Sequence, residues 1–165
     1  MKNRPTAAVA LTLLFVTLLM TSVVHAADKP ARALLAQATS EAQKWQKDAA
    51  LVYVSTDSAN PDGTAPIWIY VFESPKTKKQ IAIMVQAAGG VSSHDGSSTF
   101  HLPVGEFADS NKIMTEAKKN GLKPNKYGTK MSLGKKTNAE WTVQEGDSFY
   151  KFDAANGKFL RKEQL

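Results

Sequence analysis

The chain of 165 residues contains no cysteine. Disulfides, thiol nucleophiles and thiolate metal sites are therefore excluded, and stability has to come from a packed core. No Asn-x-Ser/Thr sequon occurs either, so N-linked glycosylation is excluded as well. Both absences fit an exported bacterial protein better than a eukaryotic extracellular protein.

Arginine is scarce after residue 26, where Arg32 and Arg161 stand beside 17 lysines. Proteins that read nucleic acids usually use arginine forks and aromatic platforms, so we do not expect a nucleic-acid partner. Lysine on loops and outer helix faces is typical of a soluble surface with protected strand edges. The net positive charge leaves weak attraction to anionic lipid, cell wall or acidic partners as an alternative. We expect at most peripheral contact with a membrane.

Recognisable catalytic patterns are also missing, since neither a phosphate loop nor a dinucleotide fingerprint occurs. His94-Asp95-Gly96-Ser97-Ser98 holds the residue types of a hydrolase triad, but without a Gly-x-Ser-x-Gly elbow. His94, His101 and Asp95 are conceivable metal ligands, yet their spacing fits no strong zinc pattern. Turn chemistry suffices to explain the oxygen-rich stretch 57–62 without calcium. We therefore predict no catalytic, cofactor-binding or metal residue, with a hydrolase using His94 or His101 as the less favoured alternative.

Residues 1–26 have the pattern of a secretory signal peptide. Lys2 and Arg4 precede an apolar run over residues 7–20, and Val24-His25-Ala26 precedes a cleavage site before Ala27. The run is shorter than the roughly 20 residues of a spanning helix. We predict a periplasmic or secreted protein of 139 residues after cleavage; a retained membrane anchor is the alternative.

Two landmarks suggest an internal repeat. Residues 40–44 (Ser-Glu-Ala-Gln-Lys) align with residues 115–119 (Thr-Glu-Ala-Lys-Lys). The sequence separation of Trp68 and Trp141 is almost the same as the separation of these two segments. We predict an α+β fold with two copies of a helix-plus-antiparallel-sheet unit, although short helical strings also recur by coincidence. The predicted organisation is a signal at 1–26, a first half at 27–90, a Gly/Ser-rich connection at 91–107 and a second half at 108–165.

Hydrophobic spacing predicts a first helix over 31–46, and Asp109-Ser110 opens a second helix that ends at Gly121. The stretch 73–79 reads as a polar hairpin loop, and the Gly/Ser-rich stretch 87–105 as a connection or mobile loop. We expect Trp45, Trp68 and Trp141 to anchor the core rather than to form a ligand platform. The predicted strands are 51–55, 67–72, 80–85, 127–133, 140–144, 149–152 and 158–160.

The C-terminal stretch Tyr150–Phe159 resembles the close of PepSY and PepSY-like domains. There a strand is followed by Asp-Ala-x-x-Gly-x-(apolar), which residues 153–159 match, and the Asp109-Ser110 helix start is similar to tandem secreted members. The first half departs from this pattern, because residues 80–90 end in Gly-Gly without the Asp-Ala motif. The resemblance implies a helix packed on an antiparallel sheet of cystatin-like topology, a secreted or membrane-proximal setting, and restraint of peptidases rather than catalysis.

From these observations we expect an exported, non-enzymatic module that binds a protein or peptide of the cell envelope, such as a peptidase. An exposed strand edge or the 87–105 stretch is the expected contact, through strand addition or insertion. The alternatives from other classes are a small-ligand carrier or a structural envelope protein.

Overall fold

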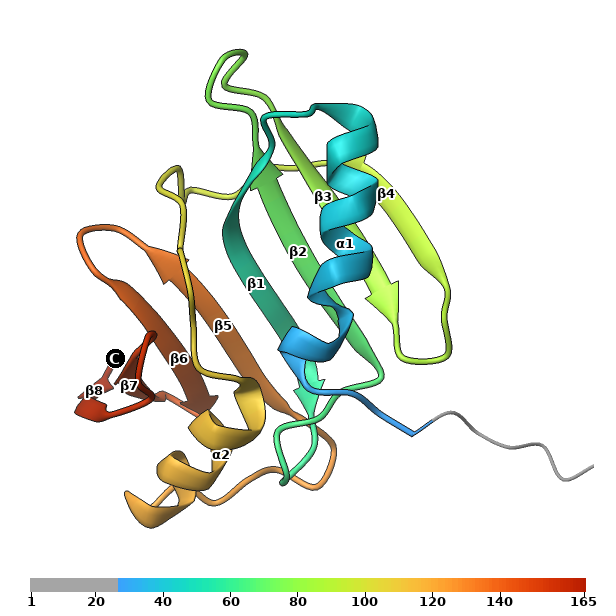
Figure 1. The fold of residues 1–165 in the computed structure, drawn as a ribbon. Coiled ribbons are helices and arrows are strands. Elements are labelled where there is room, and N and C mark those ends of the chain that lie inside the picture. Colours follow the sequence, from blue (N-terminus) through green and yellow to red (C-terminus); the bar gives the residue numbers. More distant parts are fainter. Residues whose placement is uncertain (1–26) are drawn as a thin grey trace, which may run out of the picture.

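The computed structural model describes residues 27–165, so the predicted signal at 1–26 lies outside the described residues. Within them, eight strands form one antiparallel sheet in the order β4-β3-β2-β1-β5-β6-β7-β8 (Figure 1). No helix of this part of the chain is long and apolar enough to cross a membrane. The elements are α1 (Ala31–Trp45), β1 (Ala50–Ala59), β2 (Ile67–Glu73), β3 (Gln80–Gln86), β4 (Val91–Asp95), α2 (Ser110–Lys119), β5 (Thr129–Lys135), β6 (Ala139–Glu145), β7 (Ser148–Asp153) and β8 (Phe159–Gln164).

The prediction of two helix-plus-sheet repeats is wrong, because the strands belong to one continuous sheet. β1 and β5 pair antiparallel, with Val54 opposite Leu133, and this pairing joins the strands that follow α1 to those that follow α2. A single buried cluster then contains residues from both helices and from both halves of the sheet. The partners in this pairing lie far apart in sequence, so local hydrophobic patterns do not reveal it.

Both helices cover one face of the sheet, and we call the opposite face the back face. Small buried residues of α1, among them Ala38 and Ala42, let the helix approach the strands closely. Trp68 and Trp141 are fully buried under the helices, which confirms them as core residues. Trp45 is different, since it is half-buried at the end of α1 and lines a surface pocket, so its placement in the core is wrong.

The two helices begin side by side and share their N-terminal caps. Pro30 at the start of α1 has no side-chain cap of its own. Instead, the Ala31 amide donates to Ser110 Oγ at 3.0 Å and the Arg32 amide donates to Asp109 Oδ1 at 2.9 Å. Asp109 Oδ1 also accepts the Ser110 amide, so the predicted N-cap of α2 stabilises the first turns of both helices.

The stretch predicted as a connection, 91–107, holds a strand at its start. β4 occupies Val91–Asp95 and pairs with β3 along its length. After β4 the chain crosses the ends of the strands and descends to α2 (Figure 1). We call residues 96–104 the strap, because Phe100 lies on the back face whereas Val104 reaches the core on the helix side.

Candidate functional site

The strap is fixed to the back face through an aromatic contact. The Phe100 ring stacks on Tyr53 of β1, with ring centroids 5.3 Å apart and planes 8° from parallel. A Cβ on Gly134 of β5 would lie 2.7 Å from the Phe100 ring, so only glycine leaves room for the ring there. Further along, the Val104 amide donates to the Leu51 carbonyl at 3.0 Å. Stacking and close backbone approach therefore define the path of the strap.

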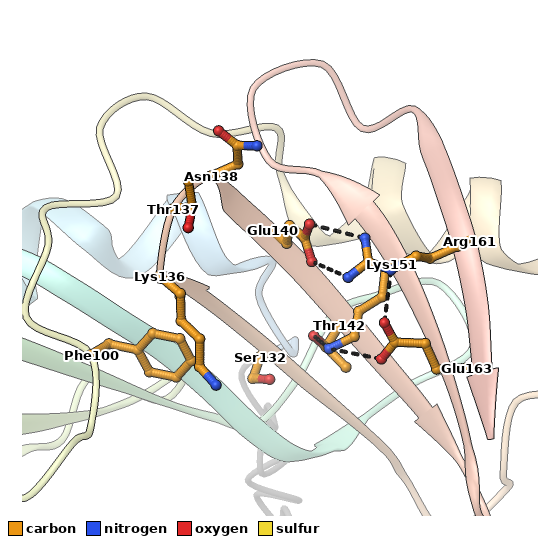
Figure 2. Close-up of a pocket in the computed structure, with 11 residues that line it drawn as sticks. Phe100, Ser132, Lys136, Thr137, Asn138, Glu140, Thr142, Lys151, Arg161 and Glu163 are labelled. Atoms are coloured by element: carbon orange, nitrogen blue, oxygen red, sulfur yellow. Dashed lines mark hydrogen bonds and ion pairs between the residues drawn. The ribbon is translucent and has the colours of Figure 1, made fainter. Parts of the chain in front are cut away.

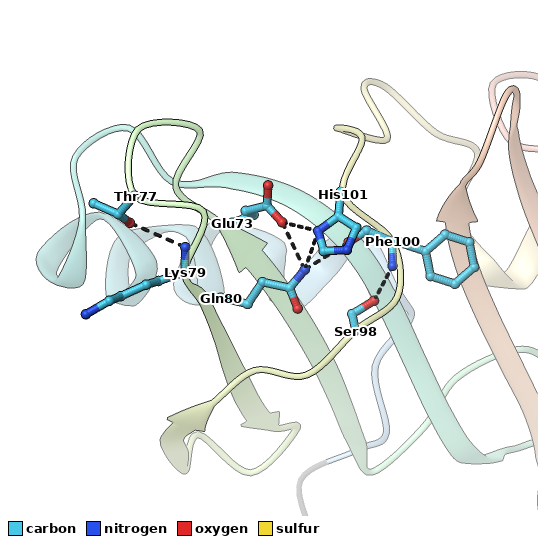
Figure 3. A network of polar contacts seen from close by, with 7 residues as sticks. All are labelled: Glu73, Thr77, Lys79, Gln80, Ser98, Phe100 and His101. Carbon is cyan, nitrogen blue, oxygen red and sulfur yellow. Dashed lines mark hydrogen bonds and ion pairs between the residues drawn. The ribbon is translucent and has the colours of Figure 1, made fainter.

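A second anchor is a polar network on the same face (Figure 3). Glu73, the last residue of β2, points to the back face with a side chain only 4% exposed, and its Oε2 bonds to His101 Nδ1. Gln80 Nε2 donates to Glu73 Oε2 and to the Phe100 carbonyl, both at 3.0 Å. These groups tie the strap to β2 and β3.

The network sets the charge state of Glu73. Burial alone raises the pKa of a carboxyl group, but the hydrogen bonds from His101 and Gln80 outweigh it, with a smaller contribution from Lys78. The pKa of Glu73 is consequently below its ordinary value. A buried carboxylate with two donors is a strong positional constraint, because losing either donor leaves the charge partly unpaired.

β4 forms one end of the sheet and, within residues 27–165, presents an unpaired backbone edge. The Gln86 amide bonds to Gly90, and the Gly96 amide bonds to Gln80, at the two ends of the β3–β4 pairing. Antiparallel pairs alternate between bonded and non-bonded positions, so Ser92 and His94 direct their backbone groups toward β3. The backbone groups of Val91, Ser93 and Asp95 then point away from the sheet. All five β4 residues are exposed.

An open pocket of about 590 Å³ adjoins the end of this edge. Trp45 contributes an aromatic wall from α1, and His101 forms part of the strap side. The pocket therefore combines an aromatic surface, lysine cations and hydroxyl groups beside the free strand. Its remaining lining residues are Lys78, Lys79, Gln80, Asp95, Gly96, Ser97 and Ser98.

The predicted hydrolase residues do not converge into a triad. His94 and Asp95 are neighbours on β4, so their side chains point to opposite faces of the sheet. His101 bonds to Glu73, and the Ser98 hydroxyl accepts the Phe100 amide. Across residues 27–165, no serine hydroxyl bonds to either histidine, and no group of three His, Asp or Glu side chains is placed to hold a metal.

Of the oxygen-rich stretch 57–62, residues 57–59 end β1 and residues 60–62 enter the turn that follows it. Asp62 Oδ1 accepts both the amide and the hydroxyl of Thr64, and these hydrogen bonds lower the pKa of Asp62. Asn60 donates to Asp28 and to Thr64. Asp57 pairs with Lys130 at 3.2 Å. Each acidic side chain of the stretch thus has a partner within the protein.

Sequence reasoning missed the two residues that define this site most clearly. Glu73 was expected in a polar loop, whereas it extends β2 and is buried beneath the strap. Ile69, Val71 and Glu73 are spaced by two residues along β2, and side chains with this spacing lie on the same face of a strand. This spacing is the signal that places Glu73 on the back face. Trp45 is the last residue of α1 and lies beyond the buried residues of this helix, so its side chain is only half-buried.

Comparisons with known proteins give no relative, since no family model, no curated protein and no solved structure matches the chain. The fold and the geometry described above therefore carry the functional argument.

Proposed function

We propose that this protein is an exported, non-enzymatic binding module that takes up an extended segment of a partner protein or peptide along β4. One observation carries the proposal, namely that the outward backbone groups of Val91, Ser93 and Asp95 have no partner in the described part of the chain. A guest strand would satisfy these groups with the same hydrogen bonds that join neighbouring strands in the sheet.

The contrast between the two edge strands supports β4 as the docking edge. β8, at the other end, carries Arg161, Lys162 and Glu163 in succession, and charges of this kind discourage edge-to-edge pairing. β4 has neither lysine nor proline in its five residues. The protein thus protects one edge with charge and leaves the other edge open.

Local chemistry favours a segment with large side chains. Ser92 and Ser93 are small, so the side chains of a neighbouring strand would have room on both faces of the edge. The pocket beside Trp45 lies at the Asp95 end of β4, where it can take one side chain of the guest. Backbone pairing would supply affinity, and the pocket would supply selectivity.

The PepSY-like C-terminal motif favours a peptidase of the cell envelope as the partner. Peptidases read their substrates as extended chains, and a module that pairs with an extended segment can restrain such an enzyme through one of its exposed strands or loops. We expect residues 27–165 to inhibit a secreted peptidase. Inhibition assays with a panel of periplasmic peptidases measure this activity.

The experiment uses random peptides displayed on phage and selected against residues 27–165. Ser93→Pro removes one outward amide from β4, and Lys162→Pro removes one from β8 as the matched control. Selected peptides should lose about tenfold or more in affinity for Ser93→Pro and keep their affinity for Lys162→Pro. Equal affinity for the two variants, with both folded by circular dichroism, would refute binding along β4.

A further inference from the structure

A second pocket, of about 410 Å³, lies on the back face at the far side of the strap from β4 (Figure 2). Its floor is a row of residues in register across four strands. Ser132 of β5 is opposite Thr142 of β6, Thr142 is opposite Lys151 of β7, and Lys151 is opposite Arg161 of β8. Phe100 forms one wall, with its ring packed over Gly134 of β5. The row therefore presents two hydroxyl groups and two cations to one cavity.

The two carboxylates of the pocket are already occupied. Arg161 donates from both terminal nitrogens to Glu140, at 3.0 and 3.1 Å, and from Nε to Glu163 at 2.7 Å. These bonds raise the pKa of Arg161, with Glu140 as the largest cause. A bidentate pair holds both partners in one geometry. Each Glu140 oxygen thus already accepts one hydrogen bond from Arg161.

Lys151 is consequently short of a strong anionic partner. Its ammonium donates to Thr142 Oγ1 at 2.9 Å, but the nearest carboxylate oxygen, on Glu163, is 4.0 Å away. The Phe149 ring lies 6.0 Å from the same nitrogen. With a side chain only 20% exposed, this cation has exchanged much of its water for a neutral hydroxyl group. A lysine ammonium has three donors, so donors remain for a ligand.

Other donors that face the pocket are free as well. Within residues 27–165, the Ser132 hydroxyl and the Lys136 ammonium have no hydrogen-bond or ion-pair partner in the protein. Lys136 extends from the β5–β6 turn on the rim beside Phe100 (Figure 2). The charged side chains of the pocket are three cations and two carboxylates. The pocket therefore carries one excess positive charge, and two polar groups left unpaired within residues 27–165, the Ser132 hydroxyl and the Lys136 ammonium, can donate hydrogen bonds.

We propose that this pocket binds a carboxylate group, held by the Lys151 ammonium and the Ser132 hydroxyl on the floor and by Lys136 at the rim. The site is separate from β4, and its ligand contacts side chains rather than an unpaired backbone edge. The carboxylate comes either from an acidic side chain of a peptide or from a free small dicarboxylate.

The test is a titration of isotope-labelled residues 27–165 at low ionic strength, followed by amide chemical shifts. Glutarate is the first probe, and a capped tripeptide with a single central glutamate is the second. Saturable shifts are expected at the amides of Ser132, Thr142 and Lys151. Tighter binding of the tripeptide identifies a peptide source, and tighter binding of glutarate identifies a free dicarboxylate.

Variants separate this site from general attraction to lysines. Lys151→Met keeps the aliphatic stem and should weaken the tighter probe about tenfold or more. Ser132→Ala removes one hydroxyl without disturbing the fold and should weaken binding about threefold or more, so the proposal does not depend on Lys151→Met folding. Lys158→Ala removes a charge from an exposed turn and should leave the affinity unchanged. Shifts scattered over the lysine surface, an equal effect of Lys158→Ala, or no saturation at millimolar probe would overturn the proposal.

Discussion

The indole rings of Trp68 and Trp141 meet edge to face at the centre of the core, with centroids 6.2 Å apart and planes at 79°. Each indole N–H bonds to the backbone just before a helix, Trp68 to the Lys29 carbonyl and Trp141 to the Ala108 carbonyl, both at 2.9 Å. One aromatic pair thereby contacts the chain just before both α1 and α2 and joins β2 in one half of the sheet to β6 in the other half. This contact is a main reason why the strands share a single core.

Replacing Trp141 with phenylalanine should lower the free energy of unfolding by about 2–4 kcal/mol. The change removes buried aromatic surface and leaves the Ala108 carbonyl without its donor. The double variant with Trp68→Phe should show a coupling energy of about 0.5–1.5 kcal/mol in urea unfolding. Trp45→Phe is the control, with a loss below about 1 kcal/mol because Trp45 is only half-buried. Additive effects of the two core variants would contradict a direct contact.

Asp109→Ala should destabilise the protein by about 1–2 kcal/mol, since its carboxylate accepts amides from the first turns of both helices. Asp109→Asn should retain much of the stability, because the amide oxygen can still accept. Urea unfolding gives both values. Asp147→Ala, in an exposed turn, should stay within about 0.5 kcal/mol of the parent. A loss for Asp109→Ala no greater than that of the control would rule out the shared cap.

Gly63→Ala should be more damaging than an ordinary substitution in a turn. Gly63 has φ +83°, and a Cβ would lie 2.5 Å from the Ser110 carbonyl oxygen at the start of α2. Gly146 also has positive φ, at +55°, but its Cβ would meet open space. We expect a loss of about 1 kcal/mol for Gly146→Ala and at least about 2 kcal/mol for Gly63→Ala. Equal losses by thermal unfolding would show that the turn does not press against α2.

The Glu73–His101 bond predicts a dependence of stability on pH. The folded state lowers the pKa of Glu73, so this group contributes stability that is full above its unfolded-state pKa of about 4.3 and is lost as pH falls through the lower folded-state value. In His101→Ala, Glu73 loses the hydrogen bond that opposes the effect of burial on its pKa. The pKa of Glu73 in the folded state should then rise, and the loss of stability should begin at higher pH. Glu73→Gln should remove this part of the pH dependence.

Urea midpoints measured from about pH 3 to about pH 7 check this prediction. His94→Ala is the matched control, because the His94 side chain is exposed and has no hydrogen bond within residues 27–165. Identical pH profiles for His101→Ala and His94→Ala would show that the contact does not hold the strap.

Much of the local structure could be predicted from the sequence. The α1 stripe, the β2–β3 hairpin and the burial of Trp68 and Trp141 follow from periodicity and residue type, and the structure confirms them. The β1–β5 pairing escaped prediction because its partners are separated by an entire half of the chain. β4 escaped because serine and glycine dominate its surroundings, and pairing with β3 overrides their weak strand preference.

The candidate site was harder to predict than the fold. The sequence drew attention to 87–105 as a contact segment, and β4 and the strap occupy it. The sequence offers His94 and His101 only as a less favoured hydrolase alternative, and in the structure His101 pairs with Glu73 from a distant strand. Such a pairing depends on tertiary structure, so neither residue identifies it alone.

Amide hydrogen exchange along β4 tests the central proposal most directly. In free residues 27–165, the amides of Ser92 and His94 should be protected by β3, whereas those of Val91, Ser93 and Asp95 should exchange quickly. With a phage-selected peptide bound, the latter three amides should slow by about tenfold or more, giving continuous protection over the strand. Unchanged exchange at these three positions, with protection appearing elsewhere in the sheet, would contradict binding at the β4 edge.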